Sequence, residues 1–358
     1  MIRPVAHISD MSPYALAQLN PPEGKRFVSL SQNESLRPPS PRVLSAATKA
    51  MASVHLYPDP DWSDLRHALS KLHGISANSV LCGNGSIELI GCLAQSFANE
   101  QNAVLAPGHA YPFFRIAAQL ARARFDTAPE SDARVSVDAL LAAVQADTRV
   151  VFVANPGNPT GTRIPRADLI HLRHNLHKDI LLVIDEAYGE FADHLEEPMF
   201  DLVERGDTVV LRTFSKAYGL AGMRVGWGVF PPNIAKEVRK AMNPNNISVT
   251  GQAAACAALE DQAYMRETCA MTARLRDRFR DRVRNAGFDT PESFSNFVLI
   301  RLGDTAKATS ADRFLRGEGI FVRPQAGAGL ADCLRVTIGF AEDLDFTAGL
   351  LEHWATEI

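Results

Sequence analysis

A lysine, two hydroxyl side chains and an arginine lie close together in residues 212–224, whose sequence is RTFSKAYGLAGMR. Lys216 follows Thr213 and Ser215 directly after an apolar run, and Arg224 closes the segment. A lysine amine can form a Schiff base with a carbonyl compound, and hydroxyl and guanidinium groups can bind a phosphate. The segment therefore indicates covalent chemistry on a lysine beside an anion-binding group.

An acid, a phenol and an amide follow two earlier apolar runs. Asp185 and Tyr188 come after residues 180–184, and Asn158 stands in NPGNPTG at residues 155–161. Pyridoxal phosphate (PLP) needs a Schiff-base lysine and an acidic partner for its pyridine nitrogen. Asn, Gly and Pro alone would predict only a turn. In combination with Lys216, however, these residues predict a PLP enzyme.

Composition narrows the class of protein. The chain has 358 residues, 46% of them hydrophobic and 22% charged, which favours a globular protein of two domains. A net charge of -4 gives no electrostatic case for nucleic acid or for an anionic membrane. Five scattered cysteines without a CxxC pair argue against a disulfide framework or a zinc site. No apolar stretch approaches membrane-spanning length, so we expect a cytoplasmic protein without a metal site.

Short apolar runs alternate with segments of helical periodicity over most of the chain. The runs expected to be strands cover residues 79–82, 103–105, 150–153, 180–184 and 208–211. The segments with helical spacing cover residues 61–73, 86–98 and 111–121. This alternation predicts an α/β fold with a mostly parallel sheet flanked by helices, and a site at the carboxyl ends of its strands.

The pattern changes near Asn243–Asn246, where a smaller α+β domain is expected to begin. It would hold a long charged helix over about 251–285 and strands over 296–301, 320–323 and 334–338. We expect an N-terminal arm (1–45) that packs on the small domain or on a partner subunit, a large PLP-binding domain (46–245) and a small C-terminal domain (246–358).

With these residues assembled, the chain resembles the fold-type I PLP aminotransferases of class I and II. Within them it is most similar to the histidinol-phosphate aminotransferase group. The matching segments occur in the family's order and cover nearly the whole chain. They are residues 32–35 (QNES), 57–59 (YPD), 83–86 (GNGS), 155–161, 185–188 (DEAY), 212–224, 322–323 and 334–339 (LRVTIG).

The resemblance implies a catalytic role for three residues. Lys216 would form the Schiff base and carry a proton between the substrate Cα and C4′ of the cofactor. Asp185 would keep the pyridine nitrogen protonated, which strengthens the electron-accepting ring. Tyr188 and Asn158 would both contact the phenolate oxygen of PLP.

A glycine-rich loop is expected to bind the cofactor phosphate. Glycines such as Gly85 let the backbone approach an anion, and free amides at a helix start attract it. The resemblance implies backbone donors from Ser86 and Ile87, hydroxyl donors from Thr213 and Ser215, and the charge of Arg224. The family usually has an aspartate where this chain has Ile87. Backbone donation survives that difference, whereas a role for the carboxylate does not.

Two tyrosines complete the cofactor site by resemblance. Tyr111 would stack on the pyridine ring, although an aromatic residue at a helix start is more often part of a core. Tyr57 would reach the cofactor phosphate of a second subunit, so we expect a homodimer with shared active sites.

The substrate site would contain two arginines. A guanidinium group matches a carboxylate or a phosphate with two parallel hydrogen bonds. The resemblance gives this role to Arg335, assisted by Arg323, with Asn33 and Tyr14 contributed by the arm.

The reaction implied is a ping-pong transamination through a Lys216 Schiff base. The amino group would move between an amino acid or histidinol phosphate and a 2-oxo acid such as 2-oxoglutarate. An aromatic amino acid aminotransferase, or a PLP-dependent decarboxylase on the same fold, stays open because PLP stabilises the carbanion whichever bond breaks.

A PLP-sensing regulator would need a DNA-binding domain that the arm cannot supply. A nicotinamide enzyme would need a third glycine that is missing after Gly85.

Overall fold

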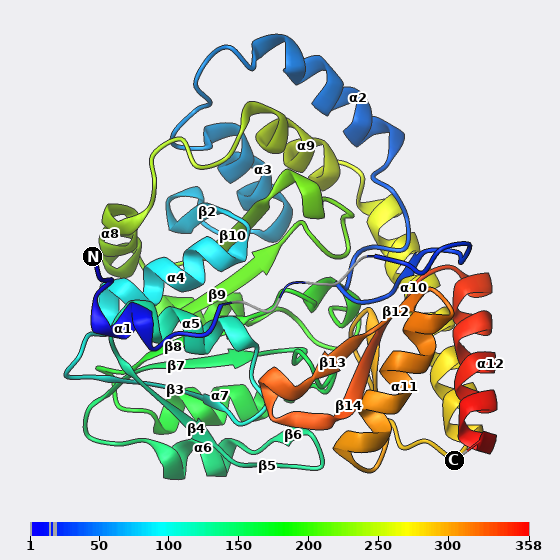
Figure 1. The fold of residues 1–358 in the computed structure, drawn as a ribbon. Helices are drawn as coiled ribbons and strands as arrows, with labels where there is room; N and C mark the ends of the chain where they lie inside the picture. Colours follow the sequence, from blue (N-terminus) through cyan, green and yellow to red (C-terminus); the bar gives the residue numbers. More distant parts are fainter. Residues whose placement is uncertain (1, 14–15, 17–19, 358) are drawn as a thin grey trace.

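The computed structural model describes residues 2–13, 16 and 20–357, and within them the largest sheet has seven strands (Figure 1). In spatial order these are β2 (Val80–Asn84), β10 (Val225–Val229), β9 (Thr208–Thr213), β8 (Leu181–Asp185), β7 (Thr148–Ala154), β3 (Ala103–Pro107) and β4 (Arg124–Ala128). Neighbours pair in parallel except β10, which is antiparallel to both β2 and β9. The prediction of a mostly parallel sheet is confirmed.

Helices accompany the large sheet and bury its apolar strands. They are α2 (Pro41–Ala50), α3 (Ser63–His73), α4 (Ser86–Phe97), α5 (Pro112–Leu120), α6 (Val137–Ala143), α7 (Arg166–Asn175), α8 (Pro232–Ala241) and α9 (Val249–Leu259). Short 3-10 turns are η1 (Met51–Ser53), η2 (Ala77–Ser79), η3 (Gly189–Phe191), η4 (Met199–Arg205) and η5 (Ala221–Met223). The central strands β3, β7, β8 and β9 are buried along almost their whole length, as runs of Val, Ile and Leu predict for a parallel sheet.

Strand β10 was not predicted, and its glycines explain both its position and the omission. A Cβ at Gly226 would overlap the backbone nitrogen of Ser86, so only glycine lets the start of α4 lie against this strand. Glycine inside a strand commonly marks such a close backbone approach. The same residue lowers strand propensity, which hides the element in the sequence.

A second, smaller core lies beside the large sheet. Its antiparallel sheet has the order β11-β14-β13 and is covered by long helices (Figure 1). The elements are α10 (Gln262–Asn285), β11 (Phe297–Arg301), α11 (Thr305–Gly317), β12 (Ile320–Phe321), β13 (Arg323–Gln325), η6 (Ala326–Ala328), β14 (Leu330–Thr337) and α12 (Ala341–Glu357). This is the expected α+β unit.

The N-terminal arm joins the smaller core. After the short helix α1 (Ala6–Ser9), strand β1 (Val28–Ser29) pairs in parallel with β12, and Val28 and Leu30 are buried in that core. Among the described helices, none combines the length and the apolar character that crossing a membrane requires.

The helix expected over residues 251–285 is two helices in the structure, α9 and α10. Helix α9 is rich in alanine, and Ala254 and Ala255 are fully buried in the larger core. Farther along, Met265 of α10 still belongs to that core, whereas Phe279 belongs to the smaller one. We therefore propose that the two domains meet along α10 rather than at residue 246.

Candidate active site

A cavity of about 830 Å³ opens at the carboxyl ends of β7, β8 and β9 and extends to the smaller domain. Parallel strands bring their final residues to one edge of a sheet, which places side chains distant in sequence beside one another. The expected site residues that line it are Asn33, Gly85, Ser86, Ile87, Tyr111, Asn158, Asp185, Tyr188, Thr213, Ser215, Lys216, Arg224, Arg323 and Arg335. The structure thus brings the expected catalytic residues Lys216, Asp185 and Tyr188 into one cavity with the expected substrate-binding residues Arg323 and Arg335.

Two expected residues are not in this group. Tyr57 lies on the loop after η1, is 87% exposed and does not line the cavity. Tyr14 lies outside the described residues.

Lys216 is held by the arm. Its Nζ donates to the carbonyl oxygens of Gln32 at 3.2 Å and Asn33 at 3.1 Å. Desolvation lowers the pKa of Lys216 to about 7, and the positive charge of Arg335 acts in the same direction. A lysine with such a pKa is about half neutral near pH 7, so it can act as a nucleophile and as a base.

Asp185 ends strand β8 and is buried at the floor of the cavity. Desolvation raises the pKa of its carboxyl group to about 7, although the backbone N–H of Ala187, which donates to Oδ1 at 3.1 Å, opposes the shift. A carboxylate in such an apolar position is stabilised by a cationic partner. A protonated ring nitrogen in the cavity would be such a partner.

A hydrogen-bonded chain of polar side chains crosses the cavity. Asn33 donates to the Tyr188 hydroxyl at 2.8 Å, and Asn158 donates to it at 3.4 Å. Arg335 donates to Asn158 Oδ1 at 2.6 Å and to the Ser31 carbonyl at 2.9 Å. The arm, the large sheet and the smaller domain are therefore linked through one network, which holds the phenol and the guanidinium group in place.

The other end of the cavity has the donors of a phosphate site. Gly85 has φ of 74°, and a Cβ there would lie 2.5 Å from Arg224 Nη2, so glycine is required. Ser86 begins α4, where backbone N–H groups are unpaired within the helix and attract anions. The Thr213 hydroxyl donates to Ser215 Oγ at 3.0 Å, which groups two hydroxyls beside this helix start.

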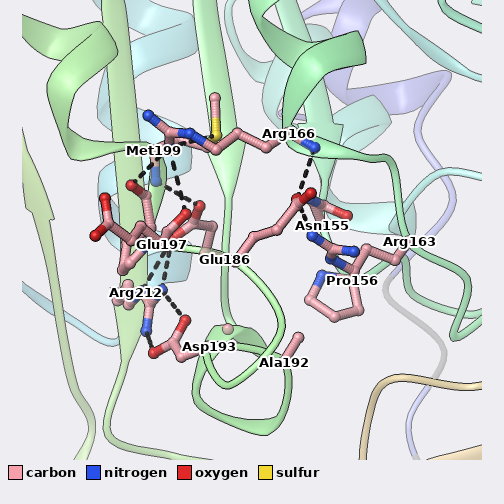
Figure 2. A pocket seen from close by; sticks show the side chains of 13 residues that line it. Asn155, Pro156, Arg163, Arg166, Glu186, Ala192, Asp193, Glu197, Met199 and Arg212 are labelled. Atoms are coloured by element: carbon pink, nitrogen blue, oxygen red, sulfur yellow. Dashed lines mark hydrogen bonds and ion pairs between the residues drawn. The ribbon is translucent and has the colours of Figure 1, made fainter.

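A buried ion-pair cluster supports the strand ends from the opposite side. Arg212 precedes Thr213 and Glu186 follows Asp185, and neighbouring side chains of a strand point to opposite faces. Arg212 binds Glu186 Oε2 at 2.7 Å and Asp193 Oδ2 at 2.7 Å, as Figure 2 shows. Because Arg212 is 1% exposed, these pairs fix β8 and β9 relative to each other.

Several residues lining the cavity were not anticipated. They are Gln32, Glu34, Arg115, Gln119 and Gln325. One signal could have found Arg115, because it lies one helical turn after Tyr111 and such positions share a helix face. Arg323 and Arg335 are direct cross-strand partners of β13 and β14, which explains why both reach the same wall.

Comparison with known proteins settles the family. A family model described as aminotransferase class I and II matches residues 25–347. The chain belongs to this family. The aminotransferase is 40% identical over 352 residues to the histidinol-phosphate aminotransferase of Rhodospirillum centenum, covering 97% of each chain. It is 39% identical to that of Paramagnetospirillum magneticum, again over 97% of each chain.

A solved structure extends the likeness to three dimensions. Histidinol-phosphate aminotransferase from Sinorhizobium meliloti, in complex with pyridoxal-5'-phosphate, superposes with a TM-score of 0.92 at 30% identity. The match covers 100% of this chain and 98% of the other. The expected fold type and the expected enzyme class, an aminotransferase, are confirmed.

Proposed function

We propose that this aminotransferase uses PLP to move an amino group between histidinol phosphate, or an amino acid, and a 2-oxo acid such as 2-oxoglutarate. The observation that carries the proposal is the presence, in one cavity, of Lys216 and Asp185 with pKa values of about 7 beside a phosphate-type donor set. The names of the most similar relatives support the choice of histidinol phosphate as amino donor.

The donor set fits PLP in charge and in chemistry. The helix start at Ser86, the hydroxyls of Thr213 and Ser215, and Arg224 would hold the phosphate. Asp185 would pair with the ring nitrogen, and Tyr188 would donate to the ring oxygen. When bound, PLP supplies an aldehyde for covalent attachment and a ring that accepts electrons released at the substrate Cα.

The side chains of the protein have separate tasks. Lys216 Nζ, whose pKa of about 7 leaves a large neutral fraction near that pH, takes the proton from the substrate Cα and can return it to another carbon. Asp185 contributes the negative charge that favours a protonated ring nitrogen. The amides of Asn33 and Asn158 fix the orientation of the Tyr188 hydroxyl.

Arg335 is proposed to bind the anionic group of the substrate. Replacing it with alanine is expected to raise KM for the amino donor and for 2-oxoglutarate by about 30-fold to 100-fold, because a charge-assisted bidentate contact is lost. Lysine keeps the charge but not the fork, so R335K should recover only part of the affinity. Exposed Arg313 provides the matched control, and R313A should behave as the wild type.

The same assay tests the proposed function. Wild-type and variant enzymes are compared with histidinol phosphate, phenylalanine, tyrosine and aspartate as donors, with detection of the 2-oxo product and of carbon dioxide. A strong preference for histidinol phosphate supports the proposal. Equal rates with the aromatic donors would favour an aromatic aminotransferase, and carbon dioxide release would favour the decarboxylase.

The proposal includes a homodimer in the cytoplasm. Apolar side chains of α2 and the following loop are exposed, namely Leu44, Met51, Val54, Leu56 and Tyr57. Contiguous exposed apolar residues are typical of an interface. All five cysteines are free, which suits a reducing compartment.

Tyr57 is proposed to complete the active site of the partner subunit. Y57A and K216A should each have low activity, while a mixture of the two after subunit exchange should exceed the sum of the parents. In the mixed dimer, one site keeps its own Lys216 and receives Tyr57 from the other subunit. If Tyr57 acted within its own chain, or if sedimentation showed a monomer, mixing would restore nothing.

A further inference from the structure

A short hairpin of the large domain lies against the smaller domain. It consists of β5 (Glu130–Ser131) and β6 (Arg134–Val135), and Figure 1 shows it close to β14. Asp132 in its turn binds Arg301 of β11 at 2.7 Å. Its first residue, Glu130, accepts a hydrogen bond at 2.7 Å from the backbone N–H of His109. The hairpin therefore contacts both the smaller domain and the turn that precedes α5.

His109 itself makes a contact between the domains. Its ring Nδ1 lies 2.9 Å from the carbonyl oxygen of Ala328 in η6. Since a carbonyl oxygen can only accept, Nδ1 must carry the proton in this bond. The ring also lies over Gly329, where an added Cβ would be 3.6 Å from Nδ1.

Both ends of this contact border the active-site cavity. Two residues after His109, Tyr111 lines the cavity and precedes α5. On the other side, η6 follows Gln325 directly, and Gln325, Gly327 and Ala328 line the same cavity. Movement of η6 would therefore displace the wall that carries the substrate-side residues.

We propose that His109 is a positioning residue whose hydrogen bond to Ala328 holds η6 against the large domain, a contact called the latch below. The latch sets the distance between residues Arg323–Ala328 of the cavity wall and the large-domain residues that would hold the cofactor. The inference rests on the proposed function, because it assigns His109 to the binding of the substrates. His109 is not among the residues that line the cavity, and it would act through the main chain of η6.

Glu130 supports the latch by holding the backbone of His109. Its Oε2 is buried without a hydrogen-bond partner among the described residues, while Oε1 accepts the His109 N–H. Desolvation raises the pKa of the Glu130 carboxyl group. Its contribution to the latch is the acceptor oxygen Oε1, which the amide oxygen of glutamine can supply.

Two amide variants separate the hydrogen bond from the bulk of the ring. The side-chain nitrogen of asparagine can occupy the position of His Nδ1, whereas that of glutamine corresponds to Nε2. H109Q and H109A are expected to raise KM for both substrates about fivefold to tenfold, the effect of one partly buried hydrogen bond, with kcat within about twofold. H109N and E130Q should stay within about twofold of the wild type in KM.

Amide hydrogen exchange of the full-length protein gives a readout independent of turnover. Peptides covering residues 323–330 should exchange faster in H109Q and H109A than in the wild type and H109N. The exposed His174 provides the control, and H174A should match the wild type in both measurements. Should H109A fail to fold, the comparison of H109N with H109Q decides.

Two results would overturn the latch. One is wild-type KM and exchange in H109Q; the other is an H109N variant as impaired as H109Q, which would show that ring packing matters instead. A wild-type enzyme without transamination of any donor would instead reject the proposed function, and the exchange comparison would still test the contact between His109 and η6.

Discussion

The K216A variant is expected to lose kcat by about 10⁴-fold or more, because both the nucleophilic amine and the proton carrier disappear with one side chain. Among the residues that the structure describes, Lys216 Nζ donates to two arm carbonyls and to no residue of the strands or the ion-pair cluster, so its removal should leave both intact. Exposed Lys178 is the matched control, and K178A should retain full activity. Full turnover in K216A would reject covalent catalysis at this position.

The lowered pKa of Lys216 predicts how the rate of its reaction with PLP depends on pH. Below about pH 7 the amine is protonated and unreactive, and above it the amine is neutral. The rate of PLP incorporation into the cofactor-free enzyme should therefore rise through about pH 7 and level off at higher pH, rather than rise toward pH 10. Borohydride reduction followed by peptide mapping should place the modification on Lys216. Incorporation elsewhere would contradict the assignment.

The sequence identifies the site best where chemistry and sheet geometry coincide. Asp185 and Thr213 are the last residues of buried strands. Such strands are recognised in the sequence as short runs of Val, Ile and Leu. Once the sheet is expected to be parallel, these strand ends must meet at one edge. Sheet geometry alone therefore gathers Asp185 and Thr213, whereas Asn158 and Lys216 lie on the loops that follow β7 and β9.

Other parts depend on contacts between distant segments. Asn33 has φ of 55°, a left-handed conformation that no local pattern indicates. It is stabilised by Thr337 and Asn296 of the smaller domain. The contact of His109 with η6 likewise joins segments far apart in sequence, so its histidine gives no signal by type or spacing.

The division of residues 249–285 shows a different limit. Helical propensity is high on both sides of Glu260, yet α9 ends at Leu259, and its buried alanines pack on α2 in the larger core. Helix α10 then runs from one core to the other with charged side chains on its exposed positions. Which core an alanine-rich helix joins is decided by tertiary packing, not by propensity.

The D185N variant is expected to lower kcat by about 10²-fold to 10³-fold or more, because a neutral amide no longer favours a protonated ring nitrogen. Asparagine is nearly the same shape as aspartate and can still accept from the Ala187 N–H. The loss would therefore report on charge rather than on packing. The exposed Asp179 provides the control, since D179N removes a charge without touching the cavity.

The D185N substitution should raise the stability of the cofactor-free protein, although it lowers kcat. The pKa of Asp185 is raised to about 7 in the folded chain, so ionisation above pH 7 is unfavourable for the fold, and the effect is absent below the ordinary value of 3.8. At pH 8 the free energy of unfolding of cofactor-free D185N, measured by denaturant titration, should exceed that of the wild type by on the order of 2–4 kcal/mol. This gain should vanish near pH 4. If Asp185 had a purely structural role, its substitution would lower the stability of the protein. Gain of stability together with loss of turnover is what a carboxylate placed for a cationic ligand requires.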